Sequence, residues 1–277
     1  MTPAEYCQDK AAQSGSSFYY SFLFLPKERR EAITALYAFC REVDDIADEC
    51  PDRDIALVKL EWWRQELART FADAPSHPVS QALLPAIRRY DLALEQLEEI
   101  IDGMEMDLQL VRYPDFKALQ LYCYRVAAVV GQLAATIFGY TDRSTLKYAH
   151  DLGIAFQLTN IIRDVGEDAR RNRIYLPQDE LAQFEVSESD ILSGRNSAGF
   201  HALMVMQTAR AQQYYQQAMQ ALPQVDRRNQ RPGLVMAAIY QAVLNEIARD
   251  DYPVLQQRVS LTPLRKLWLA WRTWVFH

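Results

Sequence analysis

Two pairs of aspartates stand four residues apart in segments whose pattern predicts helices. Asp44 and Asp48 form the first pair, and Asp164 and Asp168 form the second pair far along the chain. Residues four apart on an α-helix differ by only about 40° around its axis, so each pair presents two carboxylates on one side. Because like charges at this spacing weaken a helix slightly, a compensating cation is expected beside each pair.

Each pair is extended by polar residues on the same side of its helix. Tyr37 and Arg41 precede the first pair, and Gln157 and Asn160 precede the second. The second polar row also interrupts an apolar helix, which is unusual for a solvated surface. A single acidic pair would indicate an exposed helix face, but two extended pairs on separate helices favour a shared site.

The residue types at this site select hard cations. Mg²⁺ binds oxygen ligands, and it uses one or two carboxylates together with substrate phosphates and retained waters. The two rows thus predict a diphosphate held between two helices by bridging ions. A di-iron carboxylate bundle, the competing metal site, requires Glu-x-x-His, and no histidine here has a glutamate three residues before it. No G-x-x-x-x-G-K-[ST] loop and no G-x-G-x-x-G occurs, so metal and side chains must hold any phosphate.

The elements that carry these residues are predicted to be helices throughout. The chain of 277 residues has only 9 glycines and 12 prolines, and the prolines stand mostly between long segments of helical periodicity. We expect an all-α protein with one domain, residues 1–277, because no linker divides it. Polar loops are expected at 185–196 and 226–232. The predicted helices span about 3–13, 27–49, 52–72, 78–89, 93–108, 115–139, 142–168, 178–183, 198–222, 232–249 and 261–276.

Composition excludes several classes of protein. The net charge of −6 gives no basic footprint for nucleic acid, which is not expected as a partner. The four scattered cysteines indicate free thiols in a reducing compartment. The N-terminus has no apolar run of a secretory signal, and no stretch approaches the roughly 20 apolar residues that span a bilayer. The sequence therefore predicts a cytoplasmic protein.

One predicted helix, around Leu119–Tyr140, is rich in small residues. Small side chains let neighbouring helices approach closely, or they leave volume for a ligand between helices. The sequence leaves both alternatives open. The residues concerned are Ala127, Ala128, Gly131, Ala134 and Ala135.

Four ordered motifs resemble the squalene and phytoene synthase family, the head-to-head branch of the all-α isoprenoid synthases. The resemblance runs from about Tyr6 to Val259. The Tyr122–Gly131 motif and the Asp164–Asp168 form are most similar to bacterial presqualene diphosphate synthases of hopanoid pathways. The motifs are Ser17–Phe22 followed by Leu25-Pro26, Ala35–Asp48, Tyr122–Gly131, and Gly153–Asp168 followed by Arg173–Pro177.

The resemblance implies a head-to-head condensation of two farnesyl diphosphates. The aspartates Asp44, Asp48, Asp164 and Asp168, with Asn160, would bind two or three Mg²⁺ ions. Ionisation of one substrate would give an allylic cation, which the double bond of the second attacks. Proton loss, assisted by Tyr122 or by the released diphosphate, would then close the cyclopropane of presqualene diphosphate. The substrate contacts implied by the resemblance are Ser17, Phe18, Tyr20, Phe22, Tyr37, Arg41, Gln157, Asn160, Arg163, Arg173, Tyr175 and Tyr240.

Some of these residues also have a purely structural interpretation. Phe18, Phe22 and Tyr37 are candidates for an aromatic wall that stabilises positive charge, and each could equally be plain core. Arg170, Arg171 and Arg173 together could simply close a helix C-terminus, where cations are favoured. Of these three arginines, only Arg173 is taken as a candidate phosphate contact.

Rival functions remain at this point. A squalene synthase would add an NADPH-dependent reduction, although NADPH is not expected here, and a phytoene synthase would take geranylgeranyl diphosphate. A dehydrosqualene synthase shares nearly all of the motifs. A non-catalytic helical scaffold is the alternative outside the enzymes, but all four aspartates are intact.

The C-terminal segment has two interpretations. Residues 264–276 contain three tryptophans and three basic residues and are too short to span a membrane. Such a helix suits the interface of a bilayer, at its inner face, or packs onto the protein body. Farnesyl diphosphate is the expected ligand, and downstream pathway enzymes are candidate partners.

Overall fold

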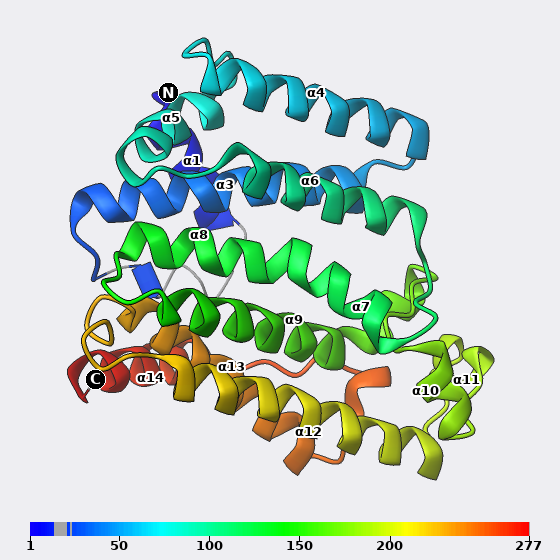
Figure 1. The fold of residues 1–277 in the computed structure, drawn as a ribbon. Coiled ribbons are helices and arrows are strands. Elements are labelled where there is room, and N and C mark those ends of the chain that lie inside the picture. Colours follow the sequence, from blue (N-terminus) through cyan, green and yellow to red (C-terminus); the bar gives the residue numbers. More distant parts are fainter. Residues whose placement is uncertain (14–20, 23, 277) are drawn as a thin grey trace.

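The computed structural model describes residues 1–13, 21–22 and 24–276, so the predicted contacts Ser17, Phe18 and Tyr20 lie outside the described residues. The described part of the chain is helical and contains no strand, which confirms the all-α prediction; one isolated bridge joins Arg112 and Ile174. The long helices stack in layers, from α4 through α3 and α6, then α8 and α9, to α12, α13 and α14 (Figure 1). Their bounds are α1 Pro3–Gln13, α3 Lys27–Glu49, α4 Arg53–Phe71, α5 Pro78–Tyr90, α6 Leu94–Gln109, α7 Phe116–Cys123, η1 Tyr124–Ala128, α8 Val129–Phe138, α9 Ser144–Arg170, α10 Gln178–Gln183, α11 Glu188–Leu192, α12 Ala198–Ala221, α13 Arg231–Arg249, η2 Pro253–Leu255 and α14 Pro263–Phe276.

Two elements differ from the sequence prediction. The helix predicted at 115–139 is interrupted by η1, a five-residue π-helix. The loop predicted at 185–196 contains the short helix α11, which begins with a capping box of Ser187 and Asp190. Capping boxes satisfy the free backbone groups at a helix start, so this signal was readable in the sequence. A π-helix within an α-helix often marks a functional site.

Glycines let α9 approach the helix that runs through η1 and α8. A Cβ atom built on Gly153 would stand 2.5 Å from the carbonyl oxygen of Ala127, and one on Gly131 would stand 2.6 Å from that of Ala149. Only glycine fits at these crossings without moving backbone. The small residues therefore serve close packing, and several of them also line the central cavity described below.

Two hydrophobic clusters form the core. One is built mainly from α9, α12 and α13, and the other mainly from α3, α4, α6 and α8. The segment Phe116–Phe138 lies between them, and by length and composition it is apolar enough to cross a membrane, which the sequence reading had not identified. Its small and aromatic side chains contribute to the core and to the cavity wall, as expected for a central helix.

Candidate active site

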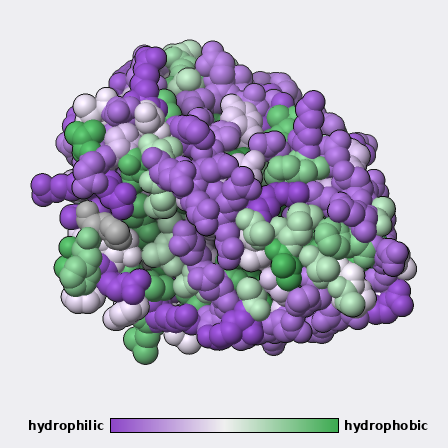
Figure 2. Space-filling model, turned by 60° about the horizontal axis from the view of Figure 1, so that its bottom comes forward, coloured by the Kyte–Doolittle hydropathy of each residue, from purple (hydrophilic) through white to green (hydrophobic). Residues whose placement is uncertain are grey.

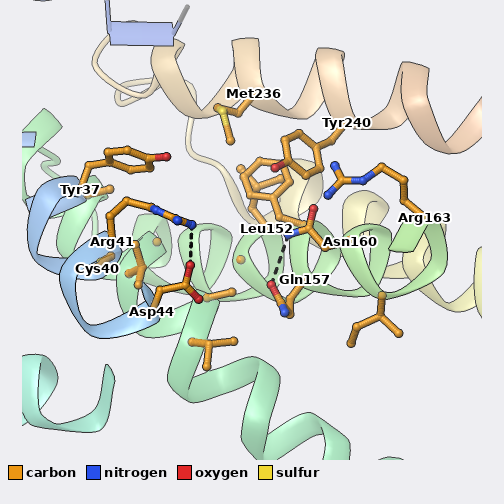
Figure 3. Close-up of a pocket in the computed structure, with 18 of the residues that line it drawn as sticks. Tyr37, Cys40, Arg41, Asp44, Leu152, Gln157, Asn160, Arg163, Met236 and Tyr240 are labelled. Atoms are coloured by element: carbon orange, nitrogen blue, oxygen red, sulfur yellow. Dashed lines mark hydrogen bonds and ion pairs between the residues drawn. The ribbon is translucent and has the colours of Figure 1, made fainter. Parts of the chain in front are cut away.

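A cavity of about 530 Å³ lies among α3, α6, α8, α9 and α13. In Figure 3, Tyr37, Arg41 and Asp44 come from α3, while Asn160 and Arg163 come from α9. Every predicted site residue that the structure describes lines this cavity: Phe22, Tyr37, Arg41, Asp44, Asp48, Tyr122, Gln157, Asn160, Arg163, Asp164, Asp168, Arg173, Tyr175 and Tyr240.

The cavity has a charged end and an apolar end, because α3 and α9 both change character along their length. On α3 the lining runs from Ile33 and Leu36 to Asp44 and Asp48, about 22 Å along the helix axis. On α9 it likewise runs from apolar residues near Leu152 to the second aspartate pair. At the apolar end the rings of Phe22 and Phe138 lie 6.3 Å apart.

Arginines join the two aspartate rows at the charged end. Arg173, which follows α9, reaches across to α3 and donates from Nη1 to Asp48 Oδ1 at 2.7 Å. Arg171 lies 3.2 Å from the other oxygen of the same carboxylate. These contacts place the rows on facing helices and at the same end of the cavity.

Asp44 and Asp164 are also paired with arginines. Arg41 Nη1 lies 2.5 Å from Asp44 Oδ2 on the same helix. Asp164 accepts hydrogen bonds from Arg163 Nε and from Arg258 Nε, each at 2.8 Å. Guanidinium forks also suit phosphate oxygens, so these arginines can exchange a carboxylate for a diphosphate.

Burial and crowding of negative charge perturb two of the carboxyl groups. Burial raises the pKa of Asp168 to about 8, and the neighbouring charges of Asp164 and Asp107 add to it. Burial also raises the pKa of Asp44 to about 6, with Arg41 opposing the shift and Asp48 adding to it. Burial therefore favours the protonated form of both groups, and a cation bound beside them would favour their ionisation.

The donor set fits Mg²⁺. The side-chain oxygen of Asn160 is buried and has no hydrogen-bond partner, while its Nδ2 donates to Gln157 Oε1 at 3.3 Å. Among the described residues no group of three or more His, Cys, Asp or Glu side chains is placed so that it could hold a metal ion by itself. Mg²⁺ needs only one or two carboxylates when substrate phosphates supply further oxygens, so the paired rows and the free amide oxygen are suitable.

A buried acid that sequence reasoning missed lies beside the rows. Asp107, on α6, is only 6% exposed and lines the cavity. Its two carboxylate oxygens accept hydrogen bonds from Tyr122 at 2.9 Å and from Tyr175 at 2.6 Å. The two tyrosine rings stack with centroids 5.3 Å apart. The pKa of Asp107 is raised to about 6 because the effect of burial exceeds the opposing effects of the tyrosine hydrogen bonds and of Arg173.

Three basic residues of the cavity were also missed. Arg171 had been assigned to a helix end only, yet it lines the cavity and pairs with Asp48. Arg258 and Lys266 come from the segment before α14 and from α14 itself. Arg171 was visible as one of a basic cluster, whereas nothing near Arg258 in the sequence marks it.

The sequence matches the family model described as squalene/phytoene synthase over residues 11–265. The chain belongs to the squalene/phytoene synthase family. It is 36% identical over 275 residues to a 15-cis-phytoene synthase of Synechococcus elongatus, covering 95% of this chain and 89% of that protein.

Solved structures agree with this family assignment. A dehydrosqualene synthase in complex with ligand superposes with a TM-score of 0.89 at 26% identity, covering 99% of this chain and 96% of the other. The squalene synthase HpnC from Alicyclobacillus acidocaldarius gives a TM-score of 0.82 at 29% identity, covering 90% and 94%. The family match and these superpositions confirm the predicted family and the isoprenoid synthase fold. Squalene/phytoene synthases are prenyltransferases that act on prenyl diphosphates and use a divalent metal.

Proposed function

We propose that this squalene/phytoene synthase joins two farnesyl diphosphates head to head and releases presqualene diphosphate and diphosphate, as a step of squalene and hopanoid biosynthesis. The observation that carries the proposal is the cavity itself, in which two facing aspartate rows lie at one end and apolar side chains line the other. A prenyl diphosphate has the same two parts. Its diphosphate matches the charged end, and its hydrocarbon tail matches the apolar end.

The charged end binds and orients the diphosphates. Asp44, Asp48, Asp164 and Asp168, with the free oxygen of Asn160, would hold two or three Mg²⁺ ions. When bound, Mg²⁺ supplies positive charge that stabilises the departing diphosphate. The guanidinium groups that now pair with the aspartates turn to the phosphate oxygens, where they fix the position of the leaving group. These residues are Arg41, Arg163, Arg171, Arg173 and Arg258.

The rest of the cavity protects the cation. An allylic cation survives only where water is excluded, and the small residues of α8 leave room for tails in a dry, apolar wall. Phe22 and Tyr37 line this wall and offer ring faces to positive charge. Gln157, Tyr175 and Tyr240 complete the proposed substrate contacts.

The Tyr122 hydroxyl is the proposed proton acceptor. Burial raises the pKa of Tyr122 well above its ordinary value, so the group is a neutral phenol. It can accept the proton lost from the substrate carbon while it passes its own proton to Asp107, with which it is already hydrogen-bonded. The carbon–hydrogen electron pair closes the cyclopropane, and the released diphosphate is the rival base.

One incubation tests the proposal. Purified protein is given farnesyl diphosphate and Mg²⁺, with and without NADPH, and the products are identified by mass spectrometry. Presqualene diphosphate in both samples supports the proposal, whereas squalene formed only with NADPH supports a squalene synthase. A folded protein that converts no prenyl diphosphate would be a scaffold instead.

Phytoene synthesis is the second candidate. It is favoured by the relatives, since the Synechococcus elongatus protein and a 36% identical Arabidopsis thaliana protein are both phytoene synthases. The same incubation with geranylgeranyl diphosphate separates the two. A higher kcat/KM for geranylgeranyl than for farnesyl diphosphate would replace the first proposal with the second.

A single substitution tests the metal role. We expect Asp164→Asn to lower kcat by about 10²-fold or more, by analogy with the loss of one group that stabilises transition-state charge. Asp102→Asn is the matched control, because Asp102 pairs with Arg64 at 2.5 Å but does not line the cavity. Both variants should keep the helical circular dichroism of the parent. Equal turnover of both variants would remove Asp164 from the site.

We also propose a single catalytic domain spanning residues 1–277 and a cytoplasmic location at the inner face of the membrane. Helices far apart in the sequence, among them α3, α6, α8, α9 and α13, contribute to one cavity, which supports the single domain. The cysteines are free, which suits a reducing compartment.

A further inference from the structure

The C-terminal helix α14 carries an exposed apolar stripe. Leu264, Trp268, Trp271 and Val275 follow one another at steps of four, three and four, so they share one side of the helix, and Leu267 borders that side. The residues of the stripe are Leu264 (79% exposed), Leu267 (43%), Trp268 (52%), Trp271 (54%) and Val275 (52%). In Figure 2, hydrophobic residues lie on the left of the face that carries α14. Monomeric soluble proteins rarely expose a contiguous stripe of this kind.

The packing of α14 onto the protein uses the opposite side of the helix. Leu269, Ala270 and Thr273 are buried, and α14 packs along α13. Trp274 packs between the two sides, with its ring centroid 5.1 Å from that of Phe24. The exposed stripe is therefore not needed to hold α14 in place.

A cation lies beside the stripe. Residues 263–276 contain no acidic residue, and of their cations Lys266 lines the cavity and Arg265 pairs with Glu246 of α13 at 2.5 Å, which leaves Arg272 for the exposed side. The guanidinium of Arg272 lies 4.7 Å above the ring of Trp268 on the exposed side. Tryptophan beside basic residues suits the interface of a bilayer with anionic lipid headgroups, where the ring enters the acyl boundary and the cation meets phosphate.

The same helix also borders the cavity. Lys266 of α14 and the preceding residues Arg258, Val259, Ser260 and Leu261 line it. A surface that contacts α14 from outside therefore lies one helix diameter, about 10 Å, from the cavity wall.

We propose that α14 docks the enzyme in the plane of an anionic lipid bilayer through Leu264, Leu267, Trp268, Trp271 and Val275. The helix is about 21 Å long, too short to cross a hydrocarbon core of about 30 Å, so it lies in the interface. A membrane is preferred to a second copy of the chain as the occupant because tryptophan beside a cation suits the lipid headgroup region, and the test below distinguishes the two. Docking gives an apolar product a short path into the membrane, and this functional benefit rests on the proposed function.

The test measures vesicle binding by the full-length protein. We expect it to sediment with vesicles containing 30% phosphatidylglycerol, at low salt, more than with pure phosphatidylcholine, since the attraction is partly electrostatic. The double variant Trp268→Ser/Trp271→Ser should lose about tenfold or more in the partition constant. Its turnover in detergent solution should stay unchanged, since neither tryptophan lines the cavity.

A matched control replaces two exposed apolar residues on another helix. Ile55 and Val58 of α4 are 52% and 69% exposed and also stand three apart, so Ile55→Ser/Val58→Ser removes a comparable patch. This control should bind vesicles like the parent. Equal vesicle binding by the parent and the α14 variant, or absence of binding by the parent, overturns the proposal. A parent dimer in vesicle-free sedimentation that the α14 variant lacks would assign the stripe to a second copy instead.

Discussion

The closest approach of two helices at the cavity gives a sharp prediction. In Gly153→Ala the new Cβ atom would stand 2.5 Å from the Ala127 carbonyl oxygen, whereas ordinary contact begins near 3.4 Å, so η1 must move by about 0.9 Å. Overpacking of this kind costs about 1–3 kcal/mol, and the higher helix propensity of alanine returns up to about 1 kcal/mol. We expect a net loss of about 1–2 kcal/mol in the free energy of unfolding.

Gly153→Ala should also lower the turnover of the protein that remains folded. Tyr122 lies immediately before Cys123 and η1, and Ala127 lines the cavity, so the displacement moves reacting groups as well as the wall. A misplacement of about 1 Å can cost about 10²-fold in rate. We therefore expect Gly153→Ala to lower kcat by about 10²-fold, measured as release of diphosphate from farnesyl diphosphate.

The control for this prediction is Gly199→Ala. A Cβ atom there would stand 2.2 Å from the Phe184 carbonyl oxygen, the same kind of backbone clash, but Gly199 lies outside the cavity lining. It should lower the melting temperature by a few degrees, at about 2–4 °C per kcal/mol, and leave kcat unchanged. If Gly153→Ala keeps the parent kcat, the cavity wall does not depend on this crossing and the reasoning is refuted.

Two further substitutions test buried carboxyl groups. Asp107→Asn leaves one acceptor oxygen for two tyrosine hydroxyls and should lower kcat at least about tenfold, with a smaller change in KM. A pH–rate profile of kcat that stays unchanged in this variant would contradict the proposed proton transfer from Tyr122 to Asp107. Glu66 is fully buried, and although burial favours its neutral form, hydrogen bonds from His77, Ser76 and Arg69 lower its pKa to about 2. Because the folded pKa lies below the ordinary value of 4.5, this stabilisation is complete above about pH 5 and is lost as the pH falls toward 2. Glu66→Gln should thus cost about 3 kcal/mol at pH 7 in urea unfolding and nearly nothing at pH 2, and a constant difference across this range would contradict the assignment.

The helices could be predicted because local pattern decides them. Long apolar periodicity predicted the limits of α3, α9 and α13 to within a few residues, and prolines stand at both ends of α3 and of α13. The π-helix η1 was not predicted in this way, and it packs closely against Gly103 of α6 and Gly153 of α9. Those contacts join parts of the chain that are far apart in sequence.

The site could be predicted where chemistry repeats along one helix. The rows at Asp44 and Asp164 were visible because each contains a second aspartate four residues later. Asp107 is one of six acids in the segment 94–109 and has no acid four residues before or after it, so only the fold shows that it meets two tyrosines. Arg258 likewise has no mark in the sequence, because only the fold brings it into contact with Asp164.

The balance of charge at the charged end of the cavity explains why metal ion and substrate are expected to bind together. Among the described residues, the cavity lining contains five acids, Asp44, Asp48, Asp107, Asp164 and Asp168, and six cations, Arg41, Arg163, Arg171, Arg173, Arg258 and Lys266. An added divalent cation alone must displace arginines from carboxylates, and an added diphosphate alone must leave carboxylates uncompensated in a buried site. If both entered together, the arginines would pair with phosphate and the carboxylates would hold the metal, so each group would keep a partner. On the proposed function, the arginine pairs of the free protein would hold both rows in position for this joint exchange, and ionisation would be favoured only with substrate and metal both bound.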